Sequence, residues 1–111
     1  MTLKNLNFIK AISNTLNLTK TDIEIIKILI SDRSGLLVSD LIKKIRRSER
    51  NVRNRLDELI QKGIIKREIE ILKNKRLAYK YYIESNDNIV NRLKRYLFDE
   101  IQELNKLNCE Y

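Results

Sequence analysis

A short basic stretch, Lys43–Arg55, reads KKIRRSERNVRNR and holds seven basic residues and one acidic residue. It therefore carries six of the eight net positive charges of the chain. Arginine can form bidentate hydrogen bonds with guanine, asparagine can do so with adenine, and both can hold phosphates. The stretch has the composition of a nucleic-acid-binding surface, although basic runs on helices are also common as plain solvated faces.

The positive charge is concentrated in the middle of the chain. Residues 1–30 sum to +2, residues 31–85 to +7 and residues 86–111 to −1, and the pI is near 9.7. A charge that served only solubility would be spread more evenly, so we expect a polyanionic partner to dock on the middle third. For a soluble domain, nucleic acid is a commoner partner of this kind than an anionic membrane.

The missing residue types argue against enzymatic chemistry. The sequence has no histidine, one cysteine (Cys109) and two glycines, Gly35 and Gly63. It therefore lacks the commonest general base, the ligands of a zinc site and a glycine-rich phosphate loop. We expect no enzyme activity, no cofactor and no metal, and at Cys109 a free thiol is favoured over an intermolecular disulfide.

No apolar run of the sequence approaches the ~20 residues that a membrane span needs. Polar residues are spread through the first 18 positions, which is unlike a signal peptide. We therefore expect a cytoplasmic, nucleoid-associated protein with no membrane partner.

Helical periodicity predicts two helices in the first third of the chain. The first covers about Leu3–Leu16. The second begins after Thr19, which forms a capping box with Asp22, and runs to about Ser31. Apolar residues on more than one face of the second helix indicate that it is deeply buried.

Two further helices follow the turn SDRSG. A short extended entry leads into a helix over about Val38–Ile45, and Ser48 then caps a helix that ends before Gly63. A helical wheel of this last helix turns Arg50, Arg53 and Asn54 away from its apolar face. Asn51 and Arg55 lie on the flank of the helix opposite to that of Arg53.

After this helix, the apolar residues recur at every second position instead of at helical spacing. The segments IIKREIEIL and LAYKYYIES alternate as strands with one face towards a core do, with Ile65, Ile69 and Ile71 on one face. They flank Lys73–Arg76, so we predict a β-hairpin with a basic tip, either solvated or touching nucleic acid. The tyrosines of the second strand are expected to pack across strands rather than to stack on bases.

The last helix is predicted over about residues 86–108 and carries apolar residues at three- and four-residue steps. It is longer than one small domain needs, so we prefer a homodimer through this helix, with the first helix as a second candidate contact, over a helix folded back on its own domain. The predicted dimer-interface residues are Val90, Leu93, Leu97, Ile101, Leu104 and Leu107.

The predicted elements follow one another as helix, helix, short helix, turn, helix and hairpin. This order is the winged helix-turn-helix plan. The segments LTKTDIEIIKILI, LLVSDLIKKI and SERNVRNRLDELIQKGIIKRE resemble small archaeal winged-helix transcriptional regulators with TrmB-like DNA-binding domains or of the short Lrs type. The fold class is thus mainly α with a small β-hairpin (α+β). We expect an N-terminal helix (1–17), a DNA-binding domain (18–85) and a C-terminal dimerisation helix (86–111).

The resemblance implies a homodimer that reads specific double-stranded DNA with the helix after Ser48 in the major groove. The predicted DNA-binding residues are Lys43, Arg46, Arg47, Ser48, Arg50, Asn51, Arg53, Asn54, Lys73, Lys75 and Arg76. Two alternatives are a non-specific DNA-coating protein and a winged-helix module that binds an acidic protein.

One turn departs from the pattern of the family. Relatives usually carry glycine and an apolar residue before the reading helix, where this chain has Arg46 and Arg47. Glycine suits the left-handed backbone of such turns, and another residue there costs about 1 kcal/mol. Either the turn has a different shape, or the arginines are present for what they touch.

Overall fold

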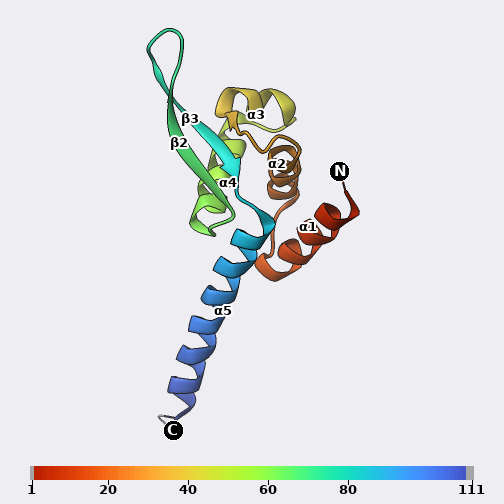
Figure 1. Ribbon diagram of the computed structural model, residues 1–111, viewed down its shortest axis with the longest axis vertical. Coiled ribbons are helices and arrows are strands. Elements are labelled where there is room, and N and C mark those ends of the chain that lie inside the picture. Colours follow the sequence, from red (N-terminus) through yellow and green to blue (C-terminus); the bar gives the residue numbers. More distant parts are fainter. Residues whose placement is uncertain (1, 110–111) are drawn as a thin grey trace.

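The computed structural model describes residues 2–109 and contains five helices and a three-stranded antiparallel sheet (Figure 1). The helices are α1 (Leu3–Leu16), α2 (Lys20–Ser31), α3 (Val38–Lys44), α4 (Glu49–Gln61) and α5 (Asn86–Cys109). The strands are β1 (Leu36–Leu37), β2 (Ile65–Ile71) and β3 (Leu77–Ile83), in the order β1-β3-β2. The predicted α+β winged helix-turn-helix architecture is confirmed. The extended entry before α3 is in fact a third strand, which pairs with β3.

Side-chain caps explain where α2 and α4 begin. The Thr19 hydroxyl accepts a hydrogen bond from the Asp22 amide (3.1 Å), and the Asp22 carboxylate accepts one from the Thr19 amide (2.9 Å). Ser48 caps α4 in the same manner by accepting from the amide of Asn51 at 3.1 Å. Both predicted caps are therefore confirmed, and each satisfies a backbone donor that the first helical turn leaves unpaired.

A Schellman motif ends α4. Gly63 has a left-handed backbone (φ 77°), its amide donates to the Ile60 carbonyl, and the Ile64 amide donates to the Leu59 carbonyl, both at 3.0 Å. This pattern satisfies the last carbonyls of the helix and turns the chain directly into β2.

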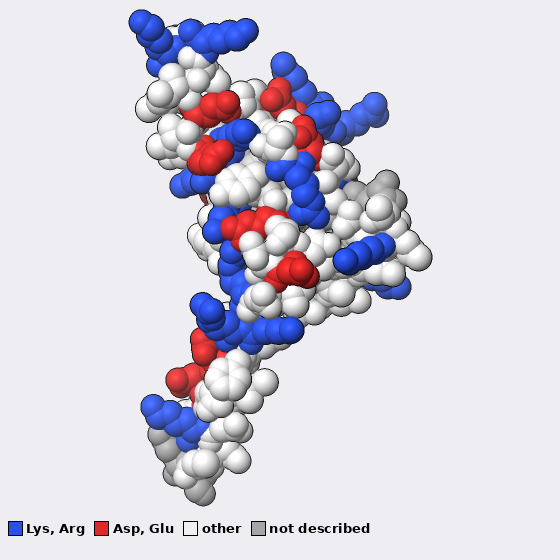
Figure 2. All heavy atoms as spheres, viewed as in Figure 1, with Lys and Arg blue, Asp and Glu red and all other residues white. Residues whose placement is uncertain are grey.

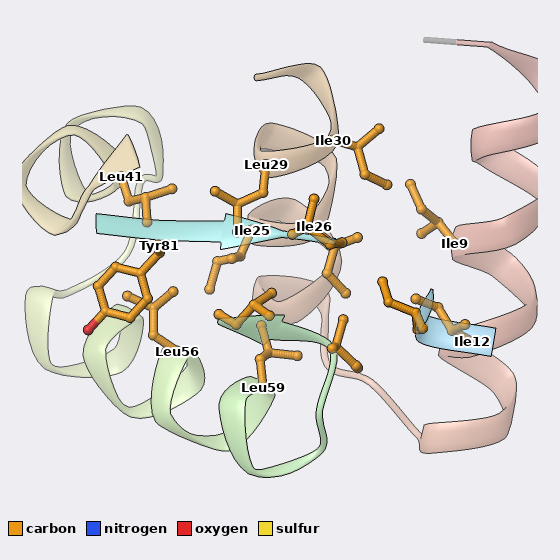
Figure 3. Close-up of a cluster of buried hydrophobic side chains, with 14 of the residues drawn as sticks. Ile9, Ile12, Ile25, Ile26, Leu29, Ile30, Leu41, Leu56, Leu59 and Tyr81 are labelled. Carbon is orange, nitrogen blue, oxygen red and sulfur yellow. The ribbon is translucent and has the colours of Figure 1, made fainter. Parts of the chain in front are cut away.

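The core is built around α2, whose apolar side chains point towards every other layer (Figure 3). Its buried side chains meet α1 on one side and α3, α4 and β3 on the other. The labelled members are Ile9 and Ile12 from α1, Ile25, Ile26, Leu29 and Ile30 from α2, Leu41 from α3, Leu56 and Leu59 from α4, and Tyr81 from β3. Burial of α2 over more than one face agrees with its sequence pattern.

The β2–β3 hairpin, the wing, extends beyond this core. Strict antiparallel register pairs Ile65 with Ile83, Ile69 with Tyr79 and so on to the tip, so the predicted alternation is present. Burial, however, ends early: Ile65 is buried, whereas Ile69 and Ile71 on the same face are exposed. The expectation that this face would pack on a core is wrong for the outer half, because the hairpin outruns the helices beneath it (Figure 1).

The wing turn holds a lysine in an unfavourable backbone conformation. The Lys75 amide donates to the Leu72 carbonyl (2.9 Å), and the Leu72 amide donates to the Arg76 carbonyl (2.8 Å). This is a three-residue hairpin loop, whose last position requires a left-handed residue and usually takes glycine. Lys75 occupies that position with φ 64°.

A buried ion pair joins α4 to α2. Arg55 donates from Nε to Asp22 Oδ1 (2.7 Å) and from Nη2 to Oδ2 (3.0 Å), and the Asp22 side chain is fully buried. Burial by itself raises the pKa of Asp22, but hydrogen bonds from Arg55 and Thr19 outweigh it and hold that pKa below its ordinary value. Asp22 therefore serves as the cap of α2 and as the anchor of α4.

Helix α5 is fastened to the domain only at its first two turns. Ile89 is buried, and Arg92 donates to the Gly63 carbonyl and to Glu84 (2.6 Å). Lys66 also pairs with Glu84 at 2.5 Å, and Lys66 together with Arg92 lowers the pKa of that carboxyl. From residue 94 to residue 109 every side chain is exposed, so α5 projects away from the domain and does not fold back on it (Figure 1).

Replacing Asp22 with asparagine should lower the free energy of unfolding by about 2–3 kcal/mol at neutral pH, because Arg55 would lose its carboxylate in a largely buried place. The pKa of Asp22 is depressed in the folded state. Its stabilisation is therefore complete above about pH 4, the unfolded value, and is lost as the pH falls through the folded value. Urea unfolding at neutral and acidic pH should show a shallower acid loss in Asp22→Asn than in the natural protein.

The control for this experiment is Arg53→Ala, which removes an exposed ion pair with Glu49 on the same helix. Its free energy of unfolding should change by less than about 0.5 kcal/mol. Equal unfolding midpoints for the two variants at neutral pH would contradict the anchoring role of Asp22.

Replacing Lys75 with glycine should raise the free energy of unfolding by about 1 kcal/mol, because glycine adopts the left-handed conformation without a steric penalty. Lys75→Ala removes the same charge but keeps the penalty, so it should bring no comparable gain. Thermal unfolding of the two variants side by side measures the difference, and a Lys75→Gly protein no more stable than Lys75→Ala would show that the turn carries no strain.

Candidate nucleic-acid interface

The first two turns of α4 separate core residues from exposed polar ones. Val52 and Leu56 are fully buried, which fixes the rotation of the helix about its axis. Arg50 and Asn54, one turn apart, are exposed on the side away from them. The helical wheel drawn from the sequence is therefore realised, and Asn51 and Arg53 are exposed on either side of this pair.

Ion pairs within the chain occupy three of the cations in the basic stretch. Arg55 binds Asp22, Arg53 donates to Glu49 at 3.0 Å, and Arg47 lies 3.6 Å from Glu24. The four cations of the stretch that form no ion pair within residues 2–109 are Lys43, Lys44, Arg46 and Arg50. These four remain available to an anionic ligand without breaking an existing contact.

The turn between α3 and α4 needs no glycine. Within the described chain, Asn17 and Lys75 are the only residues other than glycine with positive φ, so Arg46 and Arg47 have ordinary backbones. The Arg47 amide donates to the Ile45 carbonyl at 2.9 Å, which closes a tight turn. The strain expected at this turn is therefore absent, and both arginine side chains are exposed.

The tip of the wing forms a second cationic region, made of Lys73, Lys75 and Arg76, all of them exposed. Figure 2 shows lysine and arginine covering this tip and gathering again near α3, with acidic and basic side chains mixed over the body of the domain below them. Ser48 and Lys43, at the start of α4 and the end of α3, lie at the α3 end of this arrangement. The predicted residues thus fall into two groups, the α3–α4 corner and the wing tip.

Two tyrosines of β3, Tyr79 and Tyr81, make aromatic contacts within the protein, as expected. Tyr81 is buried in the core, and Tyr79 meets it edge-on with the ring centroids 6.5 Å apart. The Arg67 guanidinium covers the Tyr79 ring at 4.3 Å and lies 3.8 Å from Asp57 of α4. Arg67 therefore occupies one face of the Tyr79 ring.

Sequence reasoning missed the role of Arg55, although a signal for it exists. Asp22 lies three and four positions before Ile25 and Ile26, and therefore on the core face of α2. A carboxylate on such a face requires a cation. Arg55, next to buried Leu56, is the one arginine of α4 that is not fully exposed.

Residues 2–109 contain no group of three or more histidine, cysteine, aspartate or glutamate side chains that could hold a metal ion. No helix in the same range combines the length and the apolar character that a membrane crossing requires. Cys109 is exposed with a free thiol.

No protein-family model and no curated protein matches the sequence. Solved structures do match the fold. A possible transcriptional regulator from Methanosarcina mazei Go1 is similar with a TM-score of 0.69 and 23% identity, over 92% of this chain and 86% of the other. A MarR-family transcriptional regulator from Silicibacter pomeroyi has a TM-score of 0.56 and 16% identity, over 91% and 66% of the two chains.

A mutant of S. aureus MepR, bound to an oligodeoxyribonucleotide, is similar with a TM-score of 0.58 and 18% identity, over 95% of this chain and 84% of the other. The narrower resemblance to TrmB-like and Lrs-type regulators stays a prediction. At these identities the comparisons establish the fold, which is a winged helix-turn-helix shared with transcriptional regulators.

Proposed function

We propose that the protein is a homodimeric transcriptional regulator that binds specific sequences of double-stranded DNA. The observation that carries this proposal is the pair Arg50 and Asn54, exposed together on a helix whose opposite face is locked into the core. These are the side chains best suited to bidentate contacts with guanine and adenine. The DNA-bound MepR structure, which shares the fold, supports the same use of this scaffold.

In this proposal α4 enters the major groove with its first two turns. Arg50 and Asn54 face base edges directly, whereas Arg53 must first release Glu49. The side chains proposed to hold phosphates around the helix are Lys43, Arg46, Arg47, Ser48 and Asn51. The α4 N-terminus adds the favourable end of its dipole to these contacts.

The wing adds contacts with the DNA backbone or the minor groove through Lys73, Lys75 and Arg76. The conformation of Lys75 supports this assignment, because a lysine occupies a position that glycine would fill at lower cost. Strained residues of this kind cluster at functional sites.

We propose that α5 forms the dimer. Its outer part carries a row of exposed apolar side chains at helical spacing, Leu97, Ile101, Leu104 and Leu107. Leu93 packs against the core of its own chain and Val90 is half-buried, so the interface would begin mainly beyond them. Exposed Leu3 and Leu6 on α1 offer additional apolar surface. Two copies would read half-sites about one helical turn, ~34 Å, apart.

Arg50→Ala and Asn54→Ala should each weaken binding to a selected DNA site by about 1–3 kcal/mol and relax its sequence preference. Lys75→Ala should weaken all sequences alike and reduce the dependence of affinity on salt. Fluorescence anisotropy with the selected site and with random duplex as competitor, over a series of salt concentrations, measures both quantities.

Equal affinity of the natural protein for the selected and the random duplex would replace this proposal with a non-specific DNA-coating role. Absence of binding even at low salt would contradict DNA binding altogether and favour an acidic protein as partner.

Leu97→Gln combined with Leu104→Gln should convert the dimer into a monomer, because both changes place an amide in the proposed apolar seam. The fold should survive since both positions are exposed. The matched control places the same two glutamines on the other side of α5, as Asp99→Gln with Lys106→Gln, and leaves the net charge unchanged. Sedimentation velocity separates the cases, and a monomeric natural protein at high concentration would disprove the interface.

A further inference from the structure

The outer half of the wing exposes a strip of large apolar side chains. Register pairs Ile69 with Tyr79 and Ile71 with Leu77, so all four project from one face of the hairpin. The exposed fractions of Ile69, Tyr79, Ile71 and Leu77 are 62%, 44%, 72% and 67% respectively. We call these four residues the wing strip. Such a row is costly in water unless something covers it.

The carboxylates of the wing lie on only one of its two faces. Glu68 and Glu70 alternate with the strip residues along β2 and therefore lie on the opposite face. The strip face carries no carboxylate within the hairpin, and its one charged side chain is Arg67. At the end of the strip stand the three cations of the tip. The strip face is thus apolar apart from Arg67 and leads to the cationic tip, whereas the other face mixes Glu68 and Glu70 with Lys66 and Lys80.

The strip face is also the side of the sheet on which α4 lies. Ile65 and Tyr81, further in on the same face, pack in the core, and Arg67 reaches Asp57 of α4. The strip therefore continues the surface that begins at α4. A duplex whose major groove received the start of α4 would pass along this side of the wing.

We infer that the wing strip packs against the deoxyribose sugars of the DNA backbone beside the phosphates that Lys73, Lys75 and Arg76 hold. This inference rests on the proposed DNA binding and adds to it a set of apolar contact residues. Each backbone alternates an anionic phosphate with a sugar whose edge is mostly C–H, which matches cations followed by aliphatic side chains. Turning the glutamates to the far face removes the repulsion that would oppose such contact.

Geometry favours the backbone over the floor of the minor groove. Two strands are ~4.8 Å apart before their side chains are added, and the groove is only ~6 Å wide. The hairpin is therefore too broad to enter whole and lies across the groove edge. A second copy is a poorer occupant, because stacking two strip faces in parallel would bring two triply charged tips together.

The test is the double variant Ile71→Thr with Leu77→Thr in the full chain. Threonine keeps the strand preference while replacing apolar surface with a hydroxyl. Affinity is measured by anisotropy on a labelled duplex selected from a random pool by the natural protein. We expect about a tenfold loss of affinity at every salt concentration with an unchanged salt slope, because no phosphate contact is removed.

Two controls make the result specific. Ala78→Thr puts the same residue on the opposite face and should leave affinity unchanged, whereas Lys73→Gln with Lys75→Gln should flatten the salt slope. If the natural protein binds the duplex and the strip variant binds equally well, the strip inference is overturned while DNA binding stands. If the natural protein binds no DNA, both fall. A changed sedimentation coefficient of the strip variant without DNA would identify a second copy as the occupant instead.

Discussion

The orientation of α4 depends on one ion pair, Asp22 with Arg55. Caps and apolar periodicity decide where α2 and α4 begin and which faces they bury, but two smooth apolar faces can slide against each other. A bidentate guanidinium–carboxylate contact has one geometry. Because the Asp22 carboxylate is fully buried, displacing α4 would leave it as an unpaired buried charge. The free-energy cost of that unpaired charge exceeds the small net stabilisation expected from forming the pair. The pair therefore favours one crossing of α4 over α2, while buried Val52 and Leu56 set the rotation that turns Arg50 and Asn54 outwards.

The other ion pairs of the basic stretch are of a different kind. Glu49 holds Arg53 and Glu24 approaches Arg47 where all four side chains are substantially exposed, so these contacts add little stability. They restrain the arginines without DNA and can be exchanged for phosphates or bases at small cost. The stretch thus holds a structural cation, two restrained cations and four unpaired ones, and a count of positive charge alone cannot distinguish these roles.

Local patterns in the sequence predicted the elements of the fold closely, because caps, periodicity and the Gly63 stop act over a few residues. Two features depended on distant geometry and were not predicted. The alternation of β2 is the same at Ile65 and Ile71, yet only the first has a core beneath it. The helical wheel separates Arg55 from Arg50 and Arg53, but only the structure shows that it faces Asp22. The candidate site was predicted as a list of exposed residues, while its division into paired and unpaired cations required the structure.

The root of α5 connects the two proposed activities, DNA reading and dimerisation. Arg92 binds the Gly63 carbonyl, which follows directly on the end of α4, and also binds Glu84, which follows β3. From this root α5 extends over 24 residues, a length of about 36 Å. A tilt of about 10° at the root would move its far end by about 6 Å, nearly two base-pair steps of DNA. In a dimer joined through the outer part of α5, the same tilt would shift one α4 relative to the other by a comparable amount. A rigid root is therefore a condition for reading two half-sites at a fixed spacing, and the Arg92 contacts add to the packing of Ile89 and Leu93 in supplying it.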